Sequence, residues 1–374
     1  MNVIFTCGGT GGHINPAIAV ANILKERHPD CNILFVGAKD SMEENLVPRA
    51  GYPLKAIRCA GISRRLSWKG IKWNMKAIGI VRKAMMECRK IIADFKPDVI
   101  VGTGGFASFP ALYVGAQMGI PICVHESNAV PGLTTKMVAN RATKMLVSFA
   151  ESAQFYRHPE KVEVVGMPVR KEFICTEKAS ARRALGLDER PLVVSAFGSL
   201  GAEAMNRAVV EMLRLEKEHD FPFQHIHATG NTGWKWMPSQ LDEMGLTKEN
   251  CPGVDVREYI YDMPTVMAAA DVVISRAGAS SCNEIGASGT PCILIPSPNV
   301  TNHHQEKNAR ILESRGAAIV VLEPECTGQK LYDTVTQLLS DRQRCADMSV
   351  ALRNMVVLDS ADRICDMIEE LSQH

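Results

Sequence analysis

The sequence predicts an α/β protein built from two doubly wound parallel sheets. Short apolar runs rich in β-branched residues alternate with longer stretches of helical periodicity along the whole chain. Strands that are apolar throughout are typical of a parallel sheet covered by helices on both faces. The pattern restarts after about residue 170, and each half opens with a strand, a glycine-rich turn and a helix. The length of 374 residues also favours two domains.

The first half contains six apolar runs that we expect to form strands, separated by segments with helical spacing of apolar residues. The expected strands are residues 3–7, 33–37, 99–102, 122–125, 145–148 and 162–165. The expected helices are residues 14–28 and 85–95. Gly-Met-Pro-Val-Arg at residues 166–170 then reads as a linker, because glycine and proline interrupt regular structure.

The second half repeats the arrangement. Its expected strands are residues 192–197, 224–228, 272–275, 293–296 and 318–321, and its expected helices are residues 202–218, 306–315 and 361–371. We therefore expect a first domain over residues 1–166 and a second over residues 167–374, with a last helix (about residues 361–372) that is free to pack on the first domain. Ligands of open α/β sheets bind beyond the carboxyl ends of the strands, which favours an active site in a cleft between the domains.

The composition excludes several classes of protein. The chain is 46% hydrophobic and 22% charged, with a net charge of +1, so we expect a soluble globular protein and no nucleic-acid partner. Its 12 cysteines include no Cys-x-x-Cys pair, which favours buried thiols in a reducing compartment over a zinc site or disulfides. No run of about 18 apolar residues and no signal peptide is present, so we expect a cytoplasmic protein that is able to lie on a membrane surface.

The first glycine turn, Gly8-Gly9-Thr10-Gly11-Gly12, lies between an expected strand and an expected helix. Glycines let backbone N–H groups approach an anion, and the helix adds the positive end of its dipole. The turn therefore indicates a phosphate contact, although a purely structural turn also fits. His13 begins the expected helix, where the dipole favours the neutral imidazole that a general base needs. A structural or capping histidine is the competing interpretation.

Two further motifs follow strands of the first half. The second glycine turn, Gly102-Thr103-Gly104-Gly105-Phe106, is either an anion or sugar contact or a simple strand-to-helix turn. In His125-Glu126-Ser127-Asn128, polar residues crowd the end of an apolar strand, where function is expected. Asn128 is suited to a sugar hydroxyl, whereas Glu126 is equally consistent with a site role and with a buried structural acid.

The second half carries its own polar motifs. The third glycine turn, Gly198-Ser199-Leu200-Gly201-Ala202, repeats the position of the first. In the fourth turn, residues 275–284, small residues precede a helix and permit close approach of a diphosphate. Glu284 either accepts hydrogen bonds from two ribose hydroxyls or only complements the helix dipole. Gln305, in a polar segment that begins with Asn302, either contacts a sugar or belongs to a polar helix start.

The segment from Arg64 to Trp73 is basic and carries two tryptophans. A solvated charged face is one interpretation, and a surface that rests on anionic lipid headgroups is the other. On the second interpretation, the apolar residues within residues 71–86 also face the lipid.

Taken together, six segments resemble the MurG family of peptidoglycan N-acetylglucosaminyltransferases over essentially the full chain. They are GGTGGHINPAIA (residues 8–19), HESNAVPGL (125–133), GMPVR (166–170), GSLGA (198–202), residues 275–284 and QEKNA (305–309). The resemblance implies the GT-B fold, in which two Rossmann-like domains face each other across a cleft. It also implies transfer of N-acetylglucosamine, with inversion, from UDP-N-acetylglucosamine to the 4-hydroxyl of the MurNAc of lipid I, which forms lipid II.

By position, the resemblance implies a role for single residues. Ile260 would meet the uracil through its backbone, and Glu284 the ribose. Ser199 and Arg170 would lie near the diphosphate, and His13 is the candidate base. The implied donor-binding residues, which include the sugar contacts Asn128 and Gln305, are Thr10, Gly11, Gly12, Asn128, Arg170, Ser199, Ile260, Ala279, Ser280, Ser281, Cys282, Asn283, Glu284 and Gln305.

The same resemblance implies lipid I and an anionic membrane surface as partners on the cytoplasmic side, and no cofactor. The chain has no Asp-x-Asp run to hold a divalent metal on the diphosphate, so helix ends are expected to replace the metal. The chain departs from the family where Phe197 and Leu200 replace glycine and glutamine, and where Met167 and Ser127 replace asparagine and glutamine. We interpret these changes as variation between lineages.

Other functions remain open from the residues alone. A related transferase with another acceptor is one, and a nucleotide-sugar epimerase, which needs no lipid acceptor, is a second. A non-catalytic scaffold is a third. Degraded polar motifs would favour the scaffold, whereas this chain retains its polar motif residues, namely His13, Asn128, Arg170, Ser199, Glu284 and Gln305.

Overall fold

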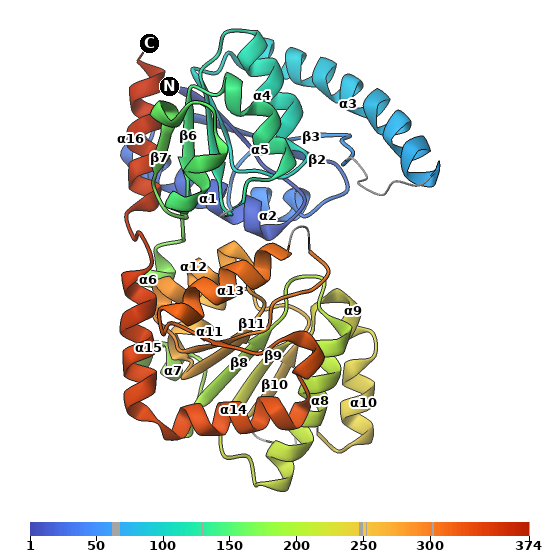
Figure 1. The fold of residues 1–374 in the computed structure, drawn as a ribbon, viewed down its shortest axis with the longest axis vertical. Helices are drawn as coiled ribbons and strands as arrows, with labels where there is room; N and C mark the ends of the chain where they lie inside the picture. The colour runs from blue at the N-terminus through green and yellow to red at the C-terminus, as the bar shows by residue number, and fades with distance from the viewer. Residues whose placement is uncertain (62–67, 129, 247–249, 252, 301–302, 374) are drawn as a thin grey trace. The chain divides into compact units, whose positions relative to one another are not determined.

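The computed structural model describes residues 1–61, 68–128, 130–246, 250–251, 253–300 and 303–373, and Figure 1 shows the fold. The chain forms two compact units. The first comprises Met1–Arg170 together with Val357–His374, and the second comprises Lys171–Val356. The first unit thus ends at Arg170, four residues beyond the boundary expected after residue 166. The C-terminal segment belongs to the first unit.

The first unit contains a seven-stranded parallel sheet with the strand order β3-β2-β1-β4-β5-β6-β7. Its strands are β1 (Asn2–Thr6), β2 (Asn32–Ala38), β3 (Leu54–Ile57), β4 (Val99–Gly102), β5 (Ile122–Glu126), β6 (Lys144–Val147) and β7 (Val162–Val164). Its helices are α1 (Gly11–Arg27), α2 (Glu43–Arg49), α3 (Trp68–Phe95), α4 (Ser108–Gln117), α5 (Leu133–Val138) and α16 (Ser360–Ser372).

The second unit contains a six-stranded parallel sheet with the order β10-β9-β8-β11-β12-β13. Its strands are β8 (Leu192–Ala196), β9 (Gln224–Ala228), β10 (Val254–Arg257), β11 (Val272–Ser275), β12 (Cys292–Leu294) and β13 (Ile319–Val320). Its helices are α6 (Glu172–Cys175), α7 (Lys178–Ala184), α8 (Glu203–Glu218), α9 (Gly230–Trp234), α10 (Met237–Glu243), α11 (Met263–Ala269), α12 (Ala279–Ser288), α13 (His304–Ser314), α14 (Gly328–Ser340) and α15 (Arg342–Asn354). The two sheets confirm the predicted pair of doubly wound parallel domains.

Two edge strands, β3 and β10, were absent from the sequence prediction. Their sequences are Leu-Lys-Ala-Ile and Val-Asp-Val-Arg, so charged residues interrupt the apolar run. A strand at the edge of a sheet is less buried than a central strand, so its run of apolar residues is shorter and harder to recognise. The prediction that His13 begins a helix was also wrong, because α1 already starts at Gly11.

Several helices begin or end at residues that are known to favour helix ends. The Thr327 side chain accepts a hydrogen bond from the backbone N–H of Lys330 at the start of α14, and the Asp341 side chain accepts one from Arg344 at the start of α15. Such caps satisfy N–H groups that have no partner inside the helix. Gly289 ends α12 in the left-handed conformation, with φ of 68°.

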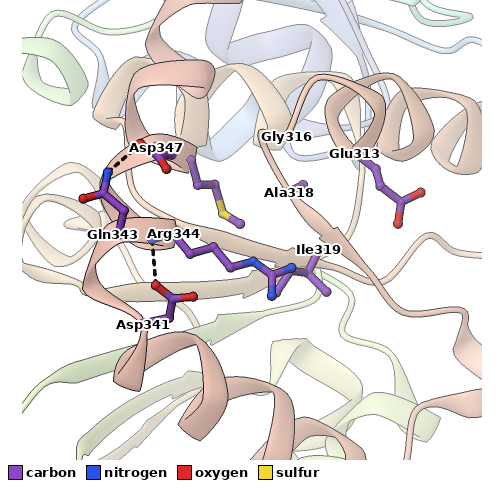
Figure 2. A pocket seen from close by; sticks show the side chains of 9 residues that line it. Glu313, Gly316, Ala318, Ile319, Asp341, Gln343, Arg344 and Asp347 are labelled. Atoms are coloured by element: carbon purple, nitrogen blue, oxygen red, sulfur yellow. Dashed lines mark hydrogen bonds between the residues drawn. The ribbon is translucent and has the colours of Figure 1, made fainter.

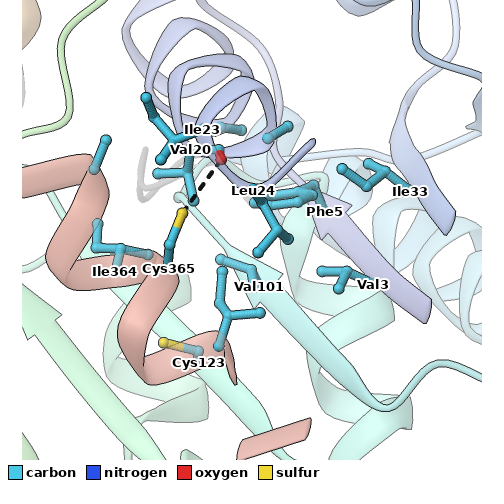
Figure 3. Close-up of a cluster of buried hydrophobic side chains, with 14 of the residues drawn as sticks. Val3, Phe5, Val20, Ile23, Leu24, Ile33, Val101, Cys123, Ile364 and Cys365 are labelled. Carbon is cyan, nitrogen blue, oxygen red and sulfur yellow. Dashed lines mark hydrogen bonds between the residues drawn. The ribbon is translucent and has the colours of Figure 1, made fainter. Parts of the chain in front are cut away.

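The first sheet is buried on both faces. One face of β1 packs against α1 and the C-terminal helix α16, and the other face packs against α3 and α4. Figure 3 shows Ile364 and Cys365 of α16 beside Val20 and Ile23 of α1, with the Cys365 thiol 3.6 Å from the carbonyl oxygen of Val20. The last helix of the chain therefore completes the core of the first unit.

Outside this core, an ionic cluster also joins α16 to α1. The guanidinium of Arg27 contacts Asp362 at 2.7 Å, Asp366 at 2.6 Å and Glu369 at 3.3 Å. Hydrogen bonds to these carboxylates, foremost to Asp366, raise the pKa of Arg27 against the opposing effect of burial. The cluster orients α16, although surface ion pairs of this kind stabilise a protein only modestly.

We expect replacement of Ile368 by alanine to destabilise the first unit by about 2–5 kcal/mol, because the side chain is fully buried in this core. The measurement is urea denaturation of the full chain. Glu370→Ala, at an exposed position of the same helix, serves as the control and is expected to change stability by no more than about 0.5 kcal/mol. Equal effects of the two changes would contradict the structural role of α16.

Candidate functional site

The order of the strands places the glycine turns at special positions. In the first sheet the chain order reverses between β1 and β4, and in the second between β8 and β11. Adjacent loops diverge at such a switch point and leave room for a ligand beyond the carboxyl ends of the strands. The first and second glycine turns follow β1 and β4, and the third and fourth turns follow β8 and β11. Each unit thus brings two predicted turns together.

The first and second glycine turns approach each other at backbone distance. Gly105 has φ of +83°, and a Cβ added to it would lie 2.0 Å from the carbonyl oxygen of Gly8. A Cβ on Gly8 would lie 2.4 Å from the Cβ of Ala107. A side chain at either position would force the turns apart, so these glycines are required by packing and by backbone conformation.

Glu43 is a residue of this region that the sequence analysis missed. The first residue of α2, it is fully buried, and its Oε1 accepts hydrogen bonds from the backbone N–H groups of Gly9 and Ala38, both at 3.1 Å. The N–H of Gly9 therefore points into the protein rather than toward a ligand. In the sequence Met42-Glu43-Glu44, nothing distinguishes Glu43 from an ordinary acidic residue at the start of a helix. Its role arises only because the fold brings it to the first glycine turn.

His13 lies in the first turn of α1, half-buried at the edge of the second glycine turn. Its carbonyl oxygen accepts a hydrogen bond of 2.6 Å from the Thr103 hydroxyl, which fixes the start of the helix to the loop after β4. A Cβ on Gly104 would lie 3.1 Å from Nδ1 of the imidazole. No acidic residue occupies the first turn of α1, so its positive end is not neutralised there.

The polar segment after β5 divides into a structural part and an open part. Glu126 is buried; its Oε1 accepts the backbone and side-chain N–H groups of Asn128 at 3.0 and 3.1 Å, and its Oε2 accepts the N–H of Gly132 at 2.9 Å. Of the two interpretations of Glu126, a site role and a buried structural acid, these hydrogen bonds support the structural acid. It orients the half-buried Asn128, whose carboxamide oxygen is left to act as an acceptor.

His125, one residue earlier, is fully buried, and its Nε2 lies 2.8 Å from the carbonyl oxygen of Gly166. Burial lowers the pKa of His125, and the nearby His13 lowers it further, whereas the Gly166 carbonyl and Glu126 act in the opposite direction. His125 is therefore neutral, and it links the end of β5 to the loop that follows β7.

The third glycine turn is held by the loop after β9. Gly198 and Gly201 have φ of +90° and +78°, and a Cβ on Gly201 would lie 2.2 Å from the carbonyl oxygen of Thr229. The backbone N–H of Asn231 donates to the carbonyl oxygen of Ser199 at 3.2 Å. Leu200, which stands where the family often has glutamine, is 73% exposed. The turn thus keeps its backbone shape while one of its side chains differs.

The fourth turn is anchored by Arg276. Its guanidinium lies 2.5 Å from a carboxylate oxygen of Glu323, donates to the carbonyl oxygen of Ile295 at 3.1 Å and lies 6.0 Å from the centre of the Phe197 ring. The guanidinium of Arg276 therefore has its partners within the protein and has a structural role. Phe197, the second departure from the family, is buried against it.

Helix α12 follows directly and starts with Ala279. Its first turn contains no acidic residue, and the nearest atom to a Cβ on Gly278 is 4.0 Å away. This uncrowded helix start suits an anion, because backbone N–H groups and the helix dipole converge there. Cys282 is buried, so its side chain faces the protein, and the half-buried Asn283 donates to the carbonyl oxygen of Ala279 in its own helix at 2.9 Å.

Two other predicted residues border the same sheet edge. Oε1 of Gln305 accepts the backbone N–H of Ser297 at 2.9 Å, which ties α13 to the loop after β12. Ile260, 2% exposed, lies in the loop after β10. Asn302 lies outside the described residues.

The structure thus separates the predicted site residues into two sets. The first unit carries Thr10, Gly11, Gly12, His13, Asn128 and Arg170, and the second carries Ser199, Ile260, Ala279, Ser280, Ser281, Cys282, Asn283, Glu284 and Gln305.

A pocket elsewhere in the second unit has a volume of about 460 Å³ and lies between α13, β13 and α15. Figure 2 shows Arg344, Asp347 and Glu313 at its rim. It contains none of the predicted site residues and none of the glycine turns, so it offers no support for the expected chemistry.

The expected membrane-facing segment is only partly described. Residues 64–67 lie outside the described residues, and the side chains of residues 68–71 do as well. The Nε1 of Trp73 donates to the carbonyl oxygen of Gly61 at 2.9 Å. None of the described helices has the length and apolarity to cross a membrane, and the described residues include no group of three or more potential metal ligands.

The fold defines a two-domain α/β protein with two open parallel sheets, and comparison with known proteins identifies its family. Residues 3–147 match the glycosyltransferase family 28 N-terminal domain, and residues 192–364 match the glycosyltransferase family 28 C-terminal domain. The chain therefore belongs to glycosyltransferase family 28 and is a hexosyltransferase.

Two relatives bear the same name, UDP-N-acetylglucosamine–N-acetylmuramyl-(pentapeptide) pyrophosphoryl-undecaprenol N-acetylglucosamine transferase. The one from Acetivibrio thermocellus is 38% identical over 100% of this chain and 99% of the relative. The one from an Exiguobacterium species is 40% identical over 100% of both chains. The crystal structure of Acinetobacter baumannii MurG is similar in fold, with a TM-score of 0.70 at 24% identity over 99% of each chain. These matches confirm the resemblance to the MurG family.

The contact between the first and second glycine turns generates a test. We expect Gly105→Ala to lower the free energy of unfolding by at least about 3 kcal/mol, because strain and a backbone clash combine. Gly119→Ala is a matched control with φ of +78° and no atom within 4 Å of the added Cβ, so only strain of about 1 kcal/mol is expected. Urea denaturation measures both. Equal effects would show that the close approach does not constrain the turn.

Proposed function

We propose that this protein transfers N-acetylglucosamine from UDP-N-acetylglucosamine to the 4-hydroxyl of the MurNAc of lipid I and so forms lipid II. The observation that carries this proposal is the full-length similarity to relatives named for that reaction, at 38 and 40% identity. The paired glycine turns at both switch points support it, since each is suited to the phosphate groups of donor or acceptor.

In this proposal the second unit binds the nucleotide. The start of α12 and the third glycine turn receive the diphosphate, because both present backbone N–H groups at the switch point of the sheet. Ser199 and Arg170 assist at the diphosphate, Glu284 accepts hydrogen bonds from the ribose hydroxyls, and the backbone of Ile260 meets the uracil. Residues 279–283 line the nucleotide, and Cys282 does so through its backbone, since its side chain is buried.

The first unit supplies the base and part of the sugar contact. Asn128, oriented by Glu126, hydrogen-bonds the N-acetylglucosamine together with Gln305 and residues 10–12. The acceptor hydroxyl attacks the anomeric carbon, His13 takes its proton, and the bond from that carbon to the diphosphate oxygen breaks. The configuration inverts, and UDP leaves with the electron pair. Fixed N–H groups and Arg170 stabilise the negative charge on the departing diphosphate.

The exposed face of α3 supports a location on the cytoplasmic side of the membrane, as a peripheral protein. Three of its apolar residues, Met75, Ile78 and Met86, are 71, 58 and 68% exposed. The exposed basic residues of the same helix are Lys72, Lys76, Arg82, Lys83, Arg89 and Lys90. Apolar groups interleaved with positive charge are the features by which a helix lies on anionic lipid.

The proposed reaction is tested by incubation of the purified protein with UDP-N-acetylglucosamine and a short-chain analogue of lipid I. We expect a disaccharide product and release of UDP that depends on the acceptor. Interconversion of the donor without an acceptor would instead indicate an epimerase, and the absence of both reactions would overturn the proposal.

For the base, we expect His13→Ala to lower kcat by about 10²–10⁴, since general base catalysis contributes rate accelerations of that size. The KM for UDP-N-acetylglucosamine is expected to change little. His158→Ala, at a half-exposed histidine elsewhere in the first unit, is the control. A kcat for the His13 variant within a factor of two or so of the wild-type value would place the base elsewhere.

For the nucleotide, we expect Glu284→Ala to weaken UDP binding by about 1.5–3 kcal/mol, the range for hydrogen bonds to a charged group. Glu284→Gln, which keeps one acceptor oxygen, is expected to lose less. Isothermal titration with UDP measures both. An alanine variant that binds UDP as tightly as the wild type would exclude the ribose contact.

For the membrane, we expect the double change Met75→Ser and Ile78→Ser to reduce sedimentation with vesicles that contain anionic lipid. Loss of two partly exposed apolar side chains removes roughly 1–3 kcal/mol of burial in the interface. Val350→Ser, at a 60% exposed position of the second unit, is the control. Unchanged sedimentation of the double variant would show that α3 is not the lipid-facing surface.

A further inference from the structure

A chain of five polar side chains crosses the core of the second unit between α8 and the strands β8 and β9. Every one of them is fully buried. Burial of polar and ionisable groups is unfavourable unless each finds a hydrogen-bond partner. The five are Ser195 of β8, Asn206 and Glu216 of α8, and His225 and His227 of β9.

Each member of this buried chain contacts the next. Oε1 of Glu216 lies 2.8 Å from Nδ1 of His225. The hydroxyl oxygen of Ser195 lies 2.7 Å from Nε2 of His225 and 2.7 Å from Nδ1 of His227. Nε2 of His227 lies 3.2 Å from Oδ1 of Asn206. The contacts run unbroken from the end of α8 to its beginning.

Asn206, at one end of the buried chain, fixes the direction of the hydrogen bonds along it. The carboxamide nitrogen of Asn206 donates to the carbonyl oxygen of Thr229 at 2.8 Å, so its Oδ1 is an acceptor. Nε2 of His227 must therefore carry a proton. Burial lowers the pKa of His227 to about 3, so the ring is neutral and its Nδ1 is an acceptor. The Ser195 hydroxyl then donates to His227.

At the other end of the buried chain, the pair of Glu216 and His225 must supply a proton for this direction of hydrogen bonding. Because Ser195 donates to His227, its oxygen accepts from Nε2 of His225. Nδ1 of His225 then shares one proton with Glu216, either from a neutral carboxyl or as an imidazolium beside a carboxylate. Burial raises the pKa of Glu216, which favours the neutral carboxyl. Oε2 of Glu216 has no hydrogen-bond partner among the described residues, which disfavours the carboxylate further.

The buried chain ends at the support of the third glycine turn. The Thr229 carbonyl oxygen that accepts from Asn206 is the atom 2.2 Å from the position of a Cβ on Gly201. The backbone N–H of Thr229 donates to the backbone carbonyl oxygen of Arg257 at 2.9 Å, so hydrogen bonds hold both the N–H and the carbonyl of Thr229. A Cβ on Gly233 would lie 2.1 Å from the carboxamide nitrogen of Asn206, so glycine at this position makes room for the amide.

We propose that Asn206 is a positioning residue for the donor diphosphate and that the buried chain from Glu216 orients it. Through the Thr229 carbonyl, Asn206 fixes the backbone against which the third glycine turn rests. This inference rests on the proposed function, because it assigns the third glycine turn to the diphosphate. It adds five buried side chains that do not touch the substrate to the determinants of donor binding.

The first test is spectroscopic and uses the unmodified full chain. Long-range proton–nitrogen NMR spectra of histidine-labelled protein report which ring nitrogen carries a proton, and His225→Gln and His227→Gln variants assign the signals. We expect a proton on Nε2 of His227 and none on its Nδ1. The opposite tautomer would overturn the direction of the buried chain, whether or not the protein binds UDP.

The second test is functional and uses Ser195→Ala, which interrupts the buried chain in its middle. The matched control is Thr334→Val, which removes a buried hydroxyl of α14 whose hydrogen bond, to the carbonyl oxygen of Lys330, stays within its own helix. We expect Ser195→Ala to raise the Kd for UDP and the KM for UDP-N-acetylglucosamine about tenfold with kcat nearly unchanged. We expect Thr334→Val to bind UDP as the wild type does.

The outcomes separate the two proposals. A wild-type protein that binds no UDP contradicts the proposed function. A wild type that binds UDP, together with a folded Ser195→Ala variant of equal affinity, overturns the positioning role alone. Equal loss in Ser195→Ala and Thr334→Val also overturns it, since the loss of any buried hydroxyl of the second unit would then have the same effect.

Discussion

Everything in the proposed site depends on close approach of backbone to backbone beyond the carboxyl ends of the strands. At the switch point of the first unit, Gly105 meets the carbonyl of Gly8. In the second unit, Gly201 in the loop after β8 meets the carbonyl of Thr229 in the loop after β9, and neither contact leaves room for a Cβ. A parallel sheet creates the diverging loops, but only glycine lets those loops close on each other. Helix α1 starts directly after the first glycine turn, which thereby positions His13.

Buried polar groups hold the turns in place from behind. Glu43 takes the N–H of Gly9, Glu126 orients Asn128, and Asn206 holds Thr229. Each of these hydrogen bonds lies within the protein, so the three residues shape the site from behind the turns. The first turns of α1 and α12 contain no acid, which leaves their positive ends available to anions. Helix ends can then stabilise a departing diphosphate in the way that a metal does elsewhere.

The sequence predicted the fold class and the central strands because their residues are apolar on both faces, as in Val3-Ile4-Phe5. It missed β3 and β10, where lysine or aspartate interrupts a short edge strand. The glycine turns were found because glycine clusters between strand and helix carry a local signal. Glu43 and the buried chain from Glu216 to Asn206 carry none, since their roles exist only after distant segments pack together. The assignment of Glu126 as structural likewise needed its three hydrogen bonds.

The central claim is that the nucleotide occupies the switch point of the second unit and not the first glycine turn. Hydrogen–deuterium exchange of the full chain with and without UDP tests it directly. We predict slower exchange of backbone amides in residues 198–202 and 276–284 when UDP is present, with residues 8–12 unchanged. Protection of residues 8–12 by UDP, with no change in the second unit, would contradict the account.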